Sequence, residues 1–241
     1  MSDKVAIGIV TYNRPEQFRT VAKAVLEQFD GIPIFAYNDG SPQTEQYSSI
    51  RKELSGSIDL VNAPVNQSVG YAKNRLLERM LDDGADWLFI LEDDIIPISP
   101  DATTAYIEAC KRSKWHHLMF AHHGELNKGV PLNTDWVWGI SFFLHCVGAW
   151  CVYTREVIEK VGLIDEAFIN AWDHVEHTWR IAQAGMTAPF WNFADVAGSD
   201  KLLAEMDLEA TPIGTRSHEA YDARVAAGLQ YWRAKDPNCP I

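Results

Sequence analysis

The sequence predicts an α/β fold in which helices flank a mostly parallel β-sheet. Short runs of apolar and β-branched residues, typical of buried strands, alternate with longer stretches whose apolar residues recur at helical spacing. Such alternation is typical of βαβ units, which contain parallel strands. The chain has 241 residues, of which 47% are hydrophobic, and no Pro/Gly/Ser-rich linker divides it. We therefore expect one domain with a sizeable core.

The first half of the chain supplies four expected strands. They are read from residues 5–11, 32–38, 58–61 and 87–91. Helices are expected between them, over residues 15–29, 47–54 and part of 66–85. Pro15 fits the first turn of the first helix, where its missing N–H costs nothing, and Gly84 ends the third helix.

The second half is less regular. Its expected elements are one or two strands within residues 141–154 and helices over residues 154–162, 174–184 and 217–234. Gly162 and Gly185 close two of these helices. Asp173 fits the N-cap of the helix over 174–184, with Glu176 three residues later completing a capping box.

Polar side chains follow three of the expected strands. Asn13 and Arg14 come after the first strand, Asp39 after the second, and the acidic residues 92–94 after the fourth. Ligands gather at the carboxyl ends of the strands in such sheets, so we expect the three clusters to converge and form a site. Each cluster alone would be an ordinary turn.

The acidic triplet ends the segment LFILEDDII. Neighbouring carboxylates are costly to desolvate unless a cation or hydrogen bonds compensate them. The strand period of two predicts Glu92 and Asp94 on one side and Asp93 on the other. Such a pair suits a divalent cation with its diphosphate. The alternative is a solvated acidic turn that caps the helix expected near Pro100 and Asp101.

Composition disfavours several partners. The chain has 33 acidic and 21 basic residues, a formal net charge of −12, which makes nucleic acids and anionic lipids unexpected partners. No apolar stretch approaches the roughly 18 residues that span a bilayer, and the amino terminus lacks the pattern of a secretory signal. The four cysteines form no CxxC pair, so we expect a reduced cytoplasmic protein without a zinc ribbon.

A family resemblance is carried by VAIGIVTYNRPEQFRTVAKAVLEQ, NDGS, NQSVGYAKNRLL and FILEDDIIP, in that order, followed by VGAWCVYTREVIEKVGLIDEAFINAWDHVEHTWRIAQAG. These segments resemble the GT-A glycosyltransferases, and most of all family 2, the nucleotide-sugar-dependent enzymes. The resemblance covers residues 4–97 and 146–185 and implies a Rossmann-like sheet in a single domain over residues 1–241. Residues 1–97 would bind the nucleotide sugar, and residues 98–241 would bind the acceptor and carry the catalytic base.

The resemblance implies roles for residues that match the family's motifs. The nucleotide-sugar site would comprise Thr11, Tyr12, Arg14, Asp39, Asn66, Gly70, Lys73, Asn74, Glu92 and Asp93. Within it, Asp39 would accept the N–H of uracil, and Glu92 and Asp93 would face the ribose and the metal. Asp94 would bind Mn²⁺ or Mg²⁺. Lys73 fits equally well a surface position on an amphipathic helix.

The segment WDHVEHTWR departs from the family, which usually has two adjacent acidic residues, the second acting as general base towards the acceptor hydroxyl. Asp173 and His174 occupy these two places. Asp173 is our first candidate because a carboxylate can stay ionised near a cation and at a helix N-terminus. His174 and Glu176 remain candidates, and a plain helix cap at Asp173 is the alternative. His218, which follows by a loop, would be a further metal ligand by its position.

Other histidines and tryptophans carry weaker expectations. Four histidines before Gly124 are expected to be solvated or hydrogen-bonded: His116, His117, His122 and His123. His174 and His177 share one helical face, but no third zinc ligand accompanies them. Four tryptophans lie in the segment that would face the acceptor, and one or two of them would stack on sugars: Trp136, Trp138, Trp150 and Trp172.

The activity implied by the resemblance is transfer of a sugar from a nucleotide sugar, first of all a UDP-sugar, to a hydroxyl of a glycan or glycoconjugate, with inversion. A divalent cation would neutralise the departing diphosphate. One alternative is a nucleotidyltransferase of similar topology, which needs a triphosphate loop rich in glycine and basic residues; GIVTYNRPEQ is poor in both. The other is a non-catalytic carbohydrate-binding protein with the same fold.

Overall fold

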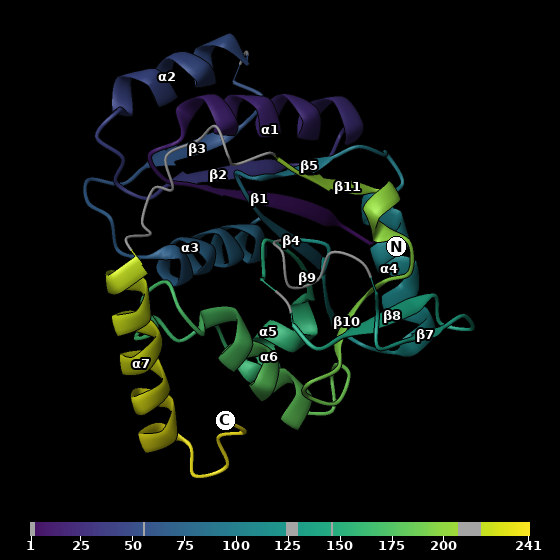
Figure 1. Ribbon diagram of the computed structural model, residues 1–241. Helices are drawn as coiled ribbons and strands as arrows, with labels where there is room; N and C mark the ends of the chain where they lie inside the picture. The colour runs from purple at the N-terminus through teal and green to yellow at the C-terminus, as the bar shows by residue number, and fades with distance from the viewer. Residues whose placement is uncertain (1–2, 55, 124–129, 146, 207–217) are drawn as a thin grey trace.

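The computed structural model of the chain has a central β-sheet, whose strands are labelled in Figure 1. It describes residues 3–54, 56–123, 130–145, 147–206 and 218–241, without the side chains of residues 218 and 219. The strands of this sheet are β1 (Val5–Thr11), β2 (Ile34–Asn38), β3 (Asp59–Asn62), β4 (Trp87–Glu92), β6 (His117–Met119) and β9 (Trp150–Thr154). Their order across the sheet is β3-β2-β1-β4-β9-β6.

The central sheet is mixed. β1 pairs in parallel with β2 and β4, and β2 with β3, whereas β9 is antiparallel to β4 and β6. The parallel part comes from the first half of the chain, as the alternation of strands and helices predicted. The predicted α/β class is therefore confirmed, and the irregular second half adds β9, which runs antiparallel to the other strands, and β6.

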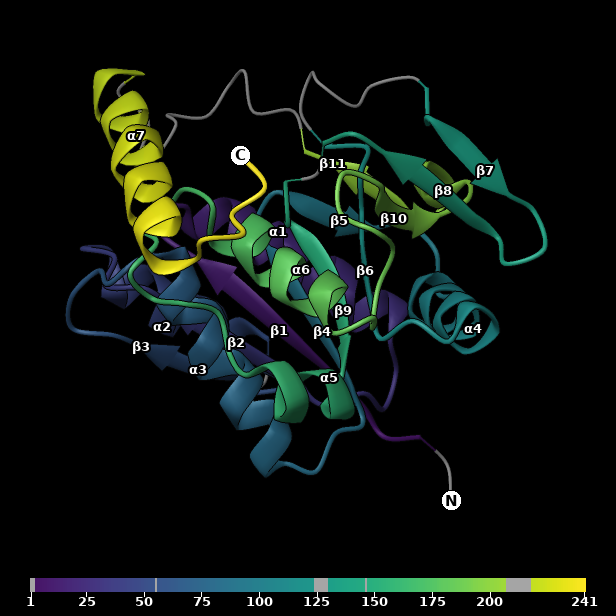
Figure 2. The same ribbon diagram turned by 90° about the horizontal axis from the view of Figure 1, so that it is seen from below.

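Helices cover both faces of the sheet (Figures 1 and 2). One face packs against α1 (Pro15–Gln28), α2 (Thr44–Glu53) and α4 (Ala102–Ser113). The other packs against α3 (Val69–Asp82), α5 (Arg155–Val161) and α6 (Asp173–Gln183). Because side chains alternate along a strand, Ile7 and Ile9 join the first core and Ala6 and Val10 the second.

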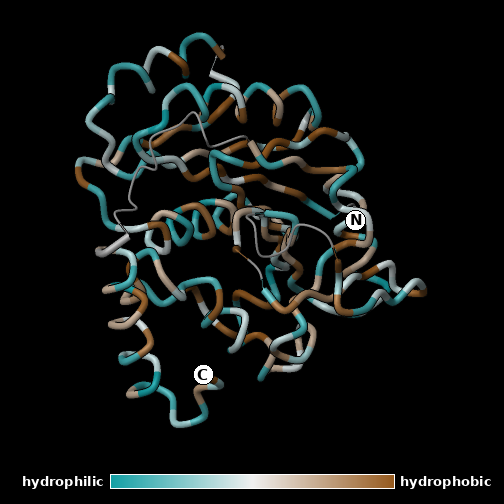
Figure 3. The backbone as a smooth tube through the Cα atoms, in the orientation of Figure 1, coloured by the Kyte–Doolittle hydropathy of each residue, from teal (hydrophilic) through white to brown (hydrophobic). Residues whose placement is uncertain are grey.

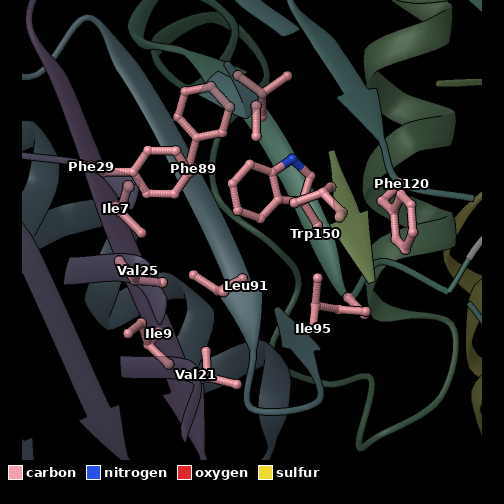
Figure 4. Packing of buried hydrophobic residues seen from close by; sticks show 14 of the residues in the cluster. Ile7, Ile9, Val21, Val25, Phe29, Phe89, Leu91, Ile95, Phe120 and Trp150 are labelled. Atoms are coloured by element: carbon pink, nitrogen blue, oxygen red, sulfur yellow. The ribbon is translucent and has the colours of Figure 1, made fainter. Parts of the chain in front are cut away.

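Trp150 lies in the first of these two cores (Figure 4). Its ring centroid is 5.4 Å from that of Phe89 and 5.9 Å from that of Tyr106, and its side chain is fully buried. Trp150 is therefore a core residue and not one of the tryptophans that would stack on a sugar, because β9 lies between β4 and β6 inside the sheet. Figure 3 shows the same organisation, with largely hydrophobic central strands and hydrophilic segments concentrated at the periphery.

Gly8 lets α3 pack closely on the sheet. A Cβ added at Gly8 would lie 3.0 Å from Ile90 Cδ1 and 3.0 Å from Leu76 Cβ, closer than side chains normally approach. The missing side chain therefore permits the contact between α3 and β1. This contact matters for the site, because α3 carries Lys73 to the sheet edge.

Two smaller sheets and a helix complete the described fold. One sheet contains β7 (Asn133–Asp135), β8 (Ile140–Phe143) and β10 (Phe193–Val196), and the other pairs β5 (Ile95–Pro97) with β11 (Leu203–Glu205). The last helix, α7 (His218–Lys235), agrees with the helix expected over residues 217–234. Within the described ranges, every helix falls short of the length and hydrophobicity that crossing a membrane requires.

Candidate functional site

The polar clusters that follow β1, β2 and β4 contact one another at one edge of the sheet. Thr11 Oγ1 donates a hydrogen bond of 2.7 Å to Asp93 Oδ2, which joins the ends of β1 and β4. The N–H of Asn13 donates to Ser41 Oγ at 2.7 Å, which joins the turns after β1 and β2. The convergence expected from the sequence is therefore present.

The acidic residues after β4 do not alternate as predicted. β4 ends at Glu92, which faces Lys73, and residues 93 and 94 form a turn. Arg14 Nη1 lies 3.1 Å from Asp93 Oδ1 and 3.1 Å from Asp94 Oδ2, so the two carboxylates share one guanidinium. The prediction that Asp93 faces the side opposite to Asp94 is wrong, because the period of two ends with the strand.

Burial governs the ionisation of the two turn carboxylates. It raises the pKa of Asp93 to about 7, although the charge of Arg14 acts in the opposite direction. Burial and the negative charge of Glu92 also raise the pKa of Asp94. Asp94 Oδ1 is buried and has no hydrogen-bond partner among the described residues. A cation beside this oxygen would compensate the desolvated charge.

Asp39 fixes the loop that leads into α3. Its carboxylate accepts hydrogen bonds of 2.9–3.0 Å from the Asn66 amide and from the backbone N–H groups of residues 67 and 68. The next residue, Gly40, has a φ of +73°, and a Cβ there would lie 2.1 Å from the backbone just before this loop. The turn after β2 therefore holds the entry to α3 in place.

Lys73 is buried, with 2% of its surface exposed, so the alternative of a surface position is wrong. Its ammonium lies 2.7 Å from Glu92 Oε1, 3.1 Å from the Gly148 carbonyl oxygen and 3.8 Å from Asp173 Oδ2. Burial alone would lower the pKa of Lys73, but the charges of Glu92 and Asp173 outweigh it and raise that pKa. Lys73 thus connects α3 with the end of β4 and the start of α6.

Asp173 is the first residue of α6, and Trp172, with a φ of 69°, occupies the N-cap position. The predicted cap at Asp173 is therefore wrong by one residue. Burial opposes ionisation of Asp173, but the neighbouring His174 and the charge of Lys73 lower its pKa to about 2. Its Oδ2 is buried and accepts no hydrogen bond from the residues described. At neutral pH, Asp173 is an ionised carboxylate with one oxygen free of hydrogen bonds within that part of the chain.

Glu176 forms two ion pairs away from this edge. Its Oε1 lies 3.0 Å from Arg180 Nε and 2.8 Å from Lys235 Nζ, so it joins α6 to α7. The predicted capping box is wrong, because these cations hold the Glu176 carboxylate. His174 Nδ1, by contrast, lies 3.7 Å from Asp173 Oδ1. Of the three candidates for the base, Asp173 and His174 lie together.

Asn74 and Gly70 contact the segment that precedes Asp173. Asn74 Nδ2 donates to the Ile164 carbonyl at 2.8 Å, and Asn74 Oδ1 accepts from the Ile164 N–H at 3.0 Å. A Cβ at Gly70 would lie 3.6 Å from Asp173 Cβ. Both residues therefore position the start of α6. Tyr12 is half-buried in the turn between β1 and α1.

The structure adds His123 and Glu205 to this edge. Glu205 pairs with Ile95 across β5 and β11, and the Met206 N–H donates to the Asp94 carbonyl oxygen at 2.8 Å. His123 Nε2 lies 3.9 Å from Asp94 Oδ1, and His123 Nδ1 lies 3.3 Å from Glu205 Oε1. The sequence singled out the histidine pair, but no spacing in it connects residues 94, 123 and 205.

Other histidines have the structural roles that were expected. His116 Nδ1 lies 2.9 Å from Thr154 Oγ1, and His117 Nδ1 lies 2.9 Å from the Val152 carbonyl oxygen, so both are hydrogen-bonded. The side chain of His218 falls outside the described part of the chain. Its role as a metal ligand stays a prediction.

The remaining tryptophans occupy different environments. Trp136 is 82% exposed on the turn between β7 and β8. Trp138 packs against Trp115, with ring centroids 5.2 Å apart, and Trp172 packs against Trp232 at 6.1 Å. Which of them contacts an acceptor stays a prediction.

A divalent cation fits this edge through Asp94. No three His, Cys, Asp or Glu side chains in the described ranges converge to hold a metal on their own. Mg²⁺, however, is commonly bound by one or two carboxylates together with substrate phosphates. The buried Asp94 Oδ1, which lacks a hydrogen-bond partner among the described groups, suits such a ligand.

Comparison with solved structures identifies the fold. The mannosyltransferase PcManGT from Pyrobaculum calidifontis, in complex with GDP-Man and Mn²⁺, matches with a TM-score of 0.63 at 14% identity, over 93% of this chain and 61% of its own. S. aureus TarS 1–349 in complex with UDP matches with a TM-score of 0.54 at 14% identity, over 75% of this chain and 54% of its own. A mycobacterial protein matches with a TM-score of 0.51 at 11% identity, over 81% of this chain and 65% of its own.

These likenesses confirm the GT-A fold predicted from the sequence. At such low identity they concern the fold alone. This chain spans about three-fifths of the mannosyltransferase and about half of TarS 1–349. No family model and no curated protein sequence matches the chain.

Proposed function

We propose that this protein is a glycosyltransferase that moves a sugar from a nucleotide sugar to an acceptor hydroxyl at the carboxyl edge of β1, β2 and β4. The observation that carries the proposal is a pair of carboxylates on this edge whose surroundings shift their pKa values in opposite directions. Asp94 and Asp173 each present a buried oxygen without a hydrogen-bond partner among the described residues, but burial raises the pKa of Asp94, whereas His174 and Lys73 lower the pKa of Asp173. The first suits a cation–diphosphate, and the second suits a base.

The donor would lie over the turns after β1 and β2. An ionised carboxylate accepts about four hydrogen bonds, and the described residues supply three to Asp39. One further position therefore remains for an N–H of the nucleotide base. Thr11, Tyr12 and Arg14 would line the nucleotide pocket. Two matched proteins hold GDP-Man and UDP, so UDP-sugars and GDP-sugars are the first donors to test.

Transfer would proceed by direct displacement with inversion. A cation held by Asp94 would neutralise the departing diphosphate. The acceptor oxygen forms the new bond to the anomeric carbon as the bond to the diphosphate breaks, and Asp173 takes the hydroxyl proton. Because the pKa of Asp173 is about 2, it is ionised at neutral pH but too weak a base to remove that proton in advance. Proton transfer would therefore accompany bond formation.

A nucleotidyltransferase is less well supported. That reaction needs several cations around a triphosphate, but the turn between β1 and α1 consists of Tyr12, Asn13 and Arg14. Its one cation, Arg14, is paired with Asp93 and Asp94.

A thermal-unfolding panel tests the proposal. The protein would be heated with UDP, GDP, CDP, their sugars and the nucleoside triphosphates, with Mn²⁺ or with EDTA. A ligand present at 100 times its Kd adds about 2.7 kcal/mol, which raises Tm by roughly 5–10 °C for a chain of this size. Stabilisation by a nucleoside diphosphate and its sugar, dependent on Mn²⁺, is expected. Stabilisation by none of these ligands would contradict the proposal, and pyrophosphate release from a triphosphate would support the nucleotidyltransferase.

A further inference from the structure

Three segments far apart in the sequence meet beside Asp94. The turn after β4 carries Asp94, the segment after β6 carries His123, and the end of β11 carries Glu205. The pairing of β5 with β11 and the hydrogen bond from Met206 to the Asp94 carbonyl fix the third segment against the first. This backbone arrangement holds two carboxylates on either side of one imidazole.

The two oxygens of the Asp94 carboxylate have different surroundings. Oδ2 accepts a hydrogen bond of 3.1 Å from Arg14. Oδ1 is buried, in a residue that is 5% exposed, and accepts no hydrogen bond from the described residues. A buried carboxylate oxygen without a donor is costly unless a cation or ligand completes its environment. His123 Nε2 lies on that side, 3.9 Å from Oδ1.

The distance between Asp94 and His123 suits two ligands of one ion. His123 Nε2 lies 3.9 Å from Asp94 Oδ1, too far for a direct hydrogen bond. Two ligands at about 2.1 Å from the same ion lie roughly 3 Å apart at right angles and about 4.2 Å apart when opposite. A separation of 3.9 Å falls inside that range. His123 is 7% exposed, so its ring is held in place by its surroundings.

Glu205 lies at the other nitrogen of the same ring. Its Oε1 is 3.3 Å from His123 Nδ1. A histidine that binds a metal commonly donates its second ring N–H to a carboxylate, which fixes the tautomer and directs the other nitrogen to the ion. The order Asp94, His123, Glu205 places one carboxylate near each ring nitrogen, and His123 Nδ1 itself makes no hydrogen bond within the described residues.

We propose that Asp94 and His123 together bind the divalent cation of this site and that Glu205 orients His123. The inference rests on the proposed function in that phosphate oxygens of the donor, with water, complete the coordination. It departs from two expectations of the sequence, that His123 has only a structural role and that His218 is the ligand accompanying Asp94. A site with one imidazole and one carboxylate suits Mn²⁺ better than Mg²⁺, which prefers oxygen ligands alone.

Mn²⁺ binding tests the inference without any measurement of turnover. Free Mn²⁺ would be measured by electron paramagnetic resonance during titration of the full chain, with and without UDP. Glu205→Gln is expected to weaken Mn²⁺ binding roughly 10-fold, within the range found when partners of metal-binding histidines are removed, and His123→Ala, which removes a ligand, by about 100-fold or more. His116→Ala is the matched control, since His116 is bonded to Thr154 at the other end of β6. Wild-type affinity in His123→Ala would overturn the inference.

A spectroscopic measurement identifies the ligand in the wild-type protein. Pulsed electron paramagnetic resonance of bound Mn²⁺ detects the hyperfine coupling to the ¹⁴N nucleus of a directly bound imidazole. Thermal unfolding in EDTA shows whether each variant is folded. The coupling is expected in the wild type, retained in His218→Ala and lost in His123→Ala. A coupling that is absent from the wild type, or that disappears only in His218→Ala, would contradict the inference.

The two proposals fail in different ways. A wild-type protein that binds Mn²⁺ and UDP but shows no dependence on His123 retains the proposed function and loses the inference. A protein that binds Mn²⁺ through His123 but responds to no nucleotide or nucleotide sugar retains the metal site and loses the glycosyltransferase.

Discussion

The ammonium of Lys73 lies 2.7 Å from Glu92 Oε1 and forms an ion pair inside the protein. The same ammonium is 3.8 Å from Asp173 Oδ2, so a single buried cation stands between the end of β4 and the start of α6. In the proposed function, the end of β4 belongs to the donor site and the start of α6 carries the base. Lys73 therefore links the two parts of the site as well as stabilising them.

Removing this cation is expected to destabilise the fold strongly. Lys73→Met leaves two carboxylates without their buried partner, and breaking a buried pair in this way costs about 3–5 kcal/mol. The matched control is Lys23→Met, because Lys23 pairs with Glu53 on the surface and its side chain is 48% exposed. Its loss is expected to cost at most about 1 kcal/mol. Urea unfolding measures the free energy of unfolding of both variants. Equal losses of stability in the two would show that Lys73 does not carry a buried ion pair.

Asp173→Asn is expected to reduce the chemical step while sparing the donor. The amide keeps the size of the side chain but cannot accept the proton, so kcat should fall by roughly 10² or more. UDP affinity should stay within about twofold of the wild type. Release of nucleoside diphosphate and calorimetric UDP titration measure the two quantities.

Glu176→Gln is the comparison for this experiment. Glu176 is held by Arg180 and Lys235, so its amide should lower stability and leave kcat close to that of the wild type. If Glu176→Gln or His174→Ala abolishes turnover while Asp173→Asn does not, the base is the residue whose substitution abolishes turnover.

Asp94→Asn is expected to remove the dependence of UDP binding on Mn²⁺. The substitution takes away the negative charge of the carboxylate that would hold the cation. Asp93→Asn is the matched control, since both Asp93 oxygens already accept hydrogen bonds, from Thr11 and Arg14. Calorimetric titration with UDP, in Mn²⁺ and in EDTA, measures how far UDP affinity depends on the cation. An undiminished dependence on Mn²⁺ in Asp94→Asn would contradict the role of Asp94 as a metal ligand.

Stability should fall on acidification because of His117. Burial lowers the pKa of His117 from 6.5 to about 4, so the unfolded chain takes up a proton near pH 6.5 while the folded protein does not until about pH 4. Acidification through this window therefore favours unfolding, by about 2 kcal/mol between pH 7 and pH 5. His117→Phe should be less stable at pH 7, where it lacks the bond to Val152, but should lose about 2 kcal/mol less on acidification. Parallel pH profiles of the two proteins would contradict this origin.

The sequence by itself determined the parallel part of the sheet and the edge where the site lies. Apolar residues recur at strand or helix spacing within the strands at 5–11, 32–38 and 87–91 and within the helix after the first strand. Such a pattern involves only residues close in sequence, so the sequence alone reveals it. Since parallel strands end at a common edge, the polar residues after them were also placed together correctly. Arg14, Asp39 and the acidic triplet lie where that reasoning put them.

Only the tertiary structure decided which groups face each other at that edge. Asp93 and Asp94 turn to one arginine because the strand stops at Glu92. Lys73 is buried because its ammonium reaches Glu92, the Gly148 carbonyl and the start of α6, which no pattern inside α3 reveals. His123 and Glu205 reach Asp94 through strand pairing across long stretches of chain. Contacts of this kind depend on the packing of whole elements, and that packing is encoded in no single segment.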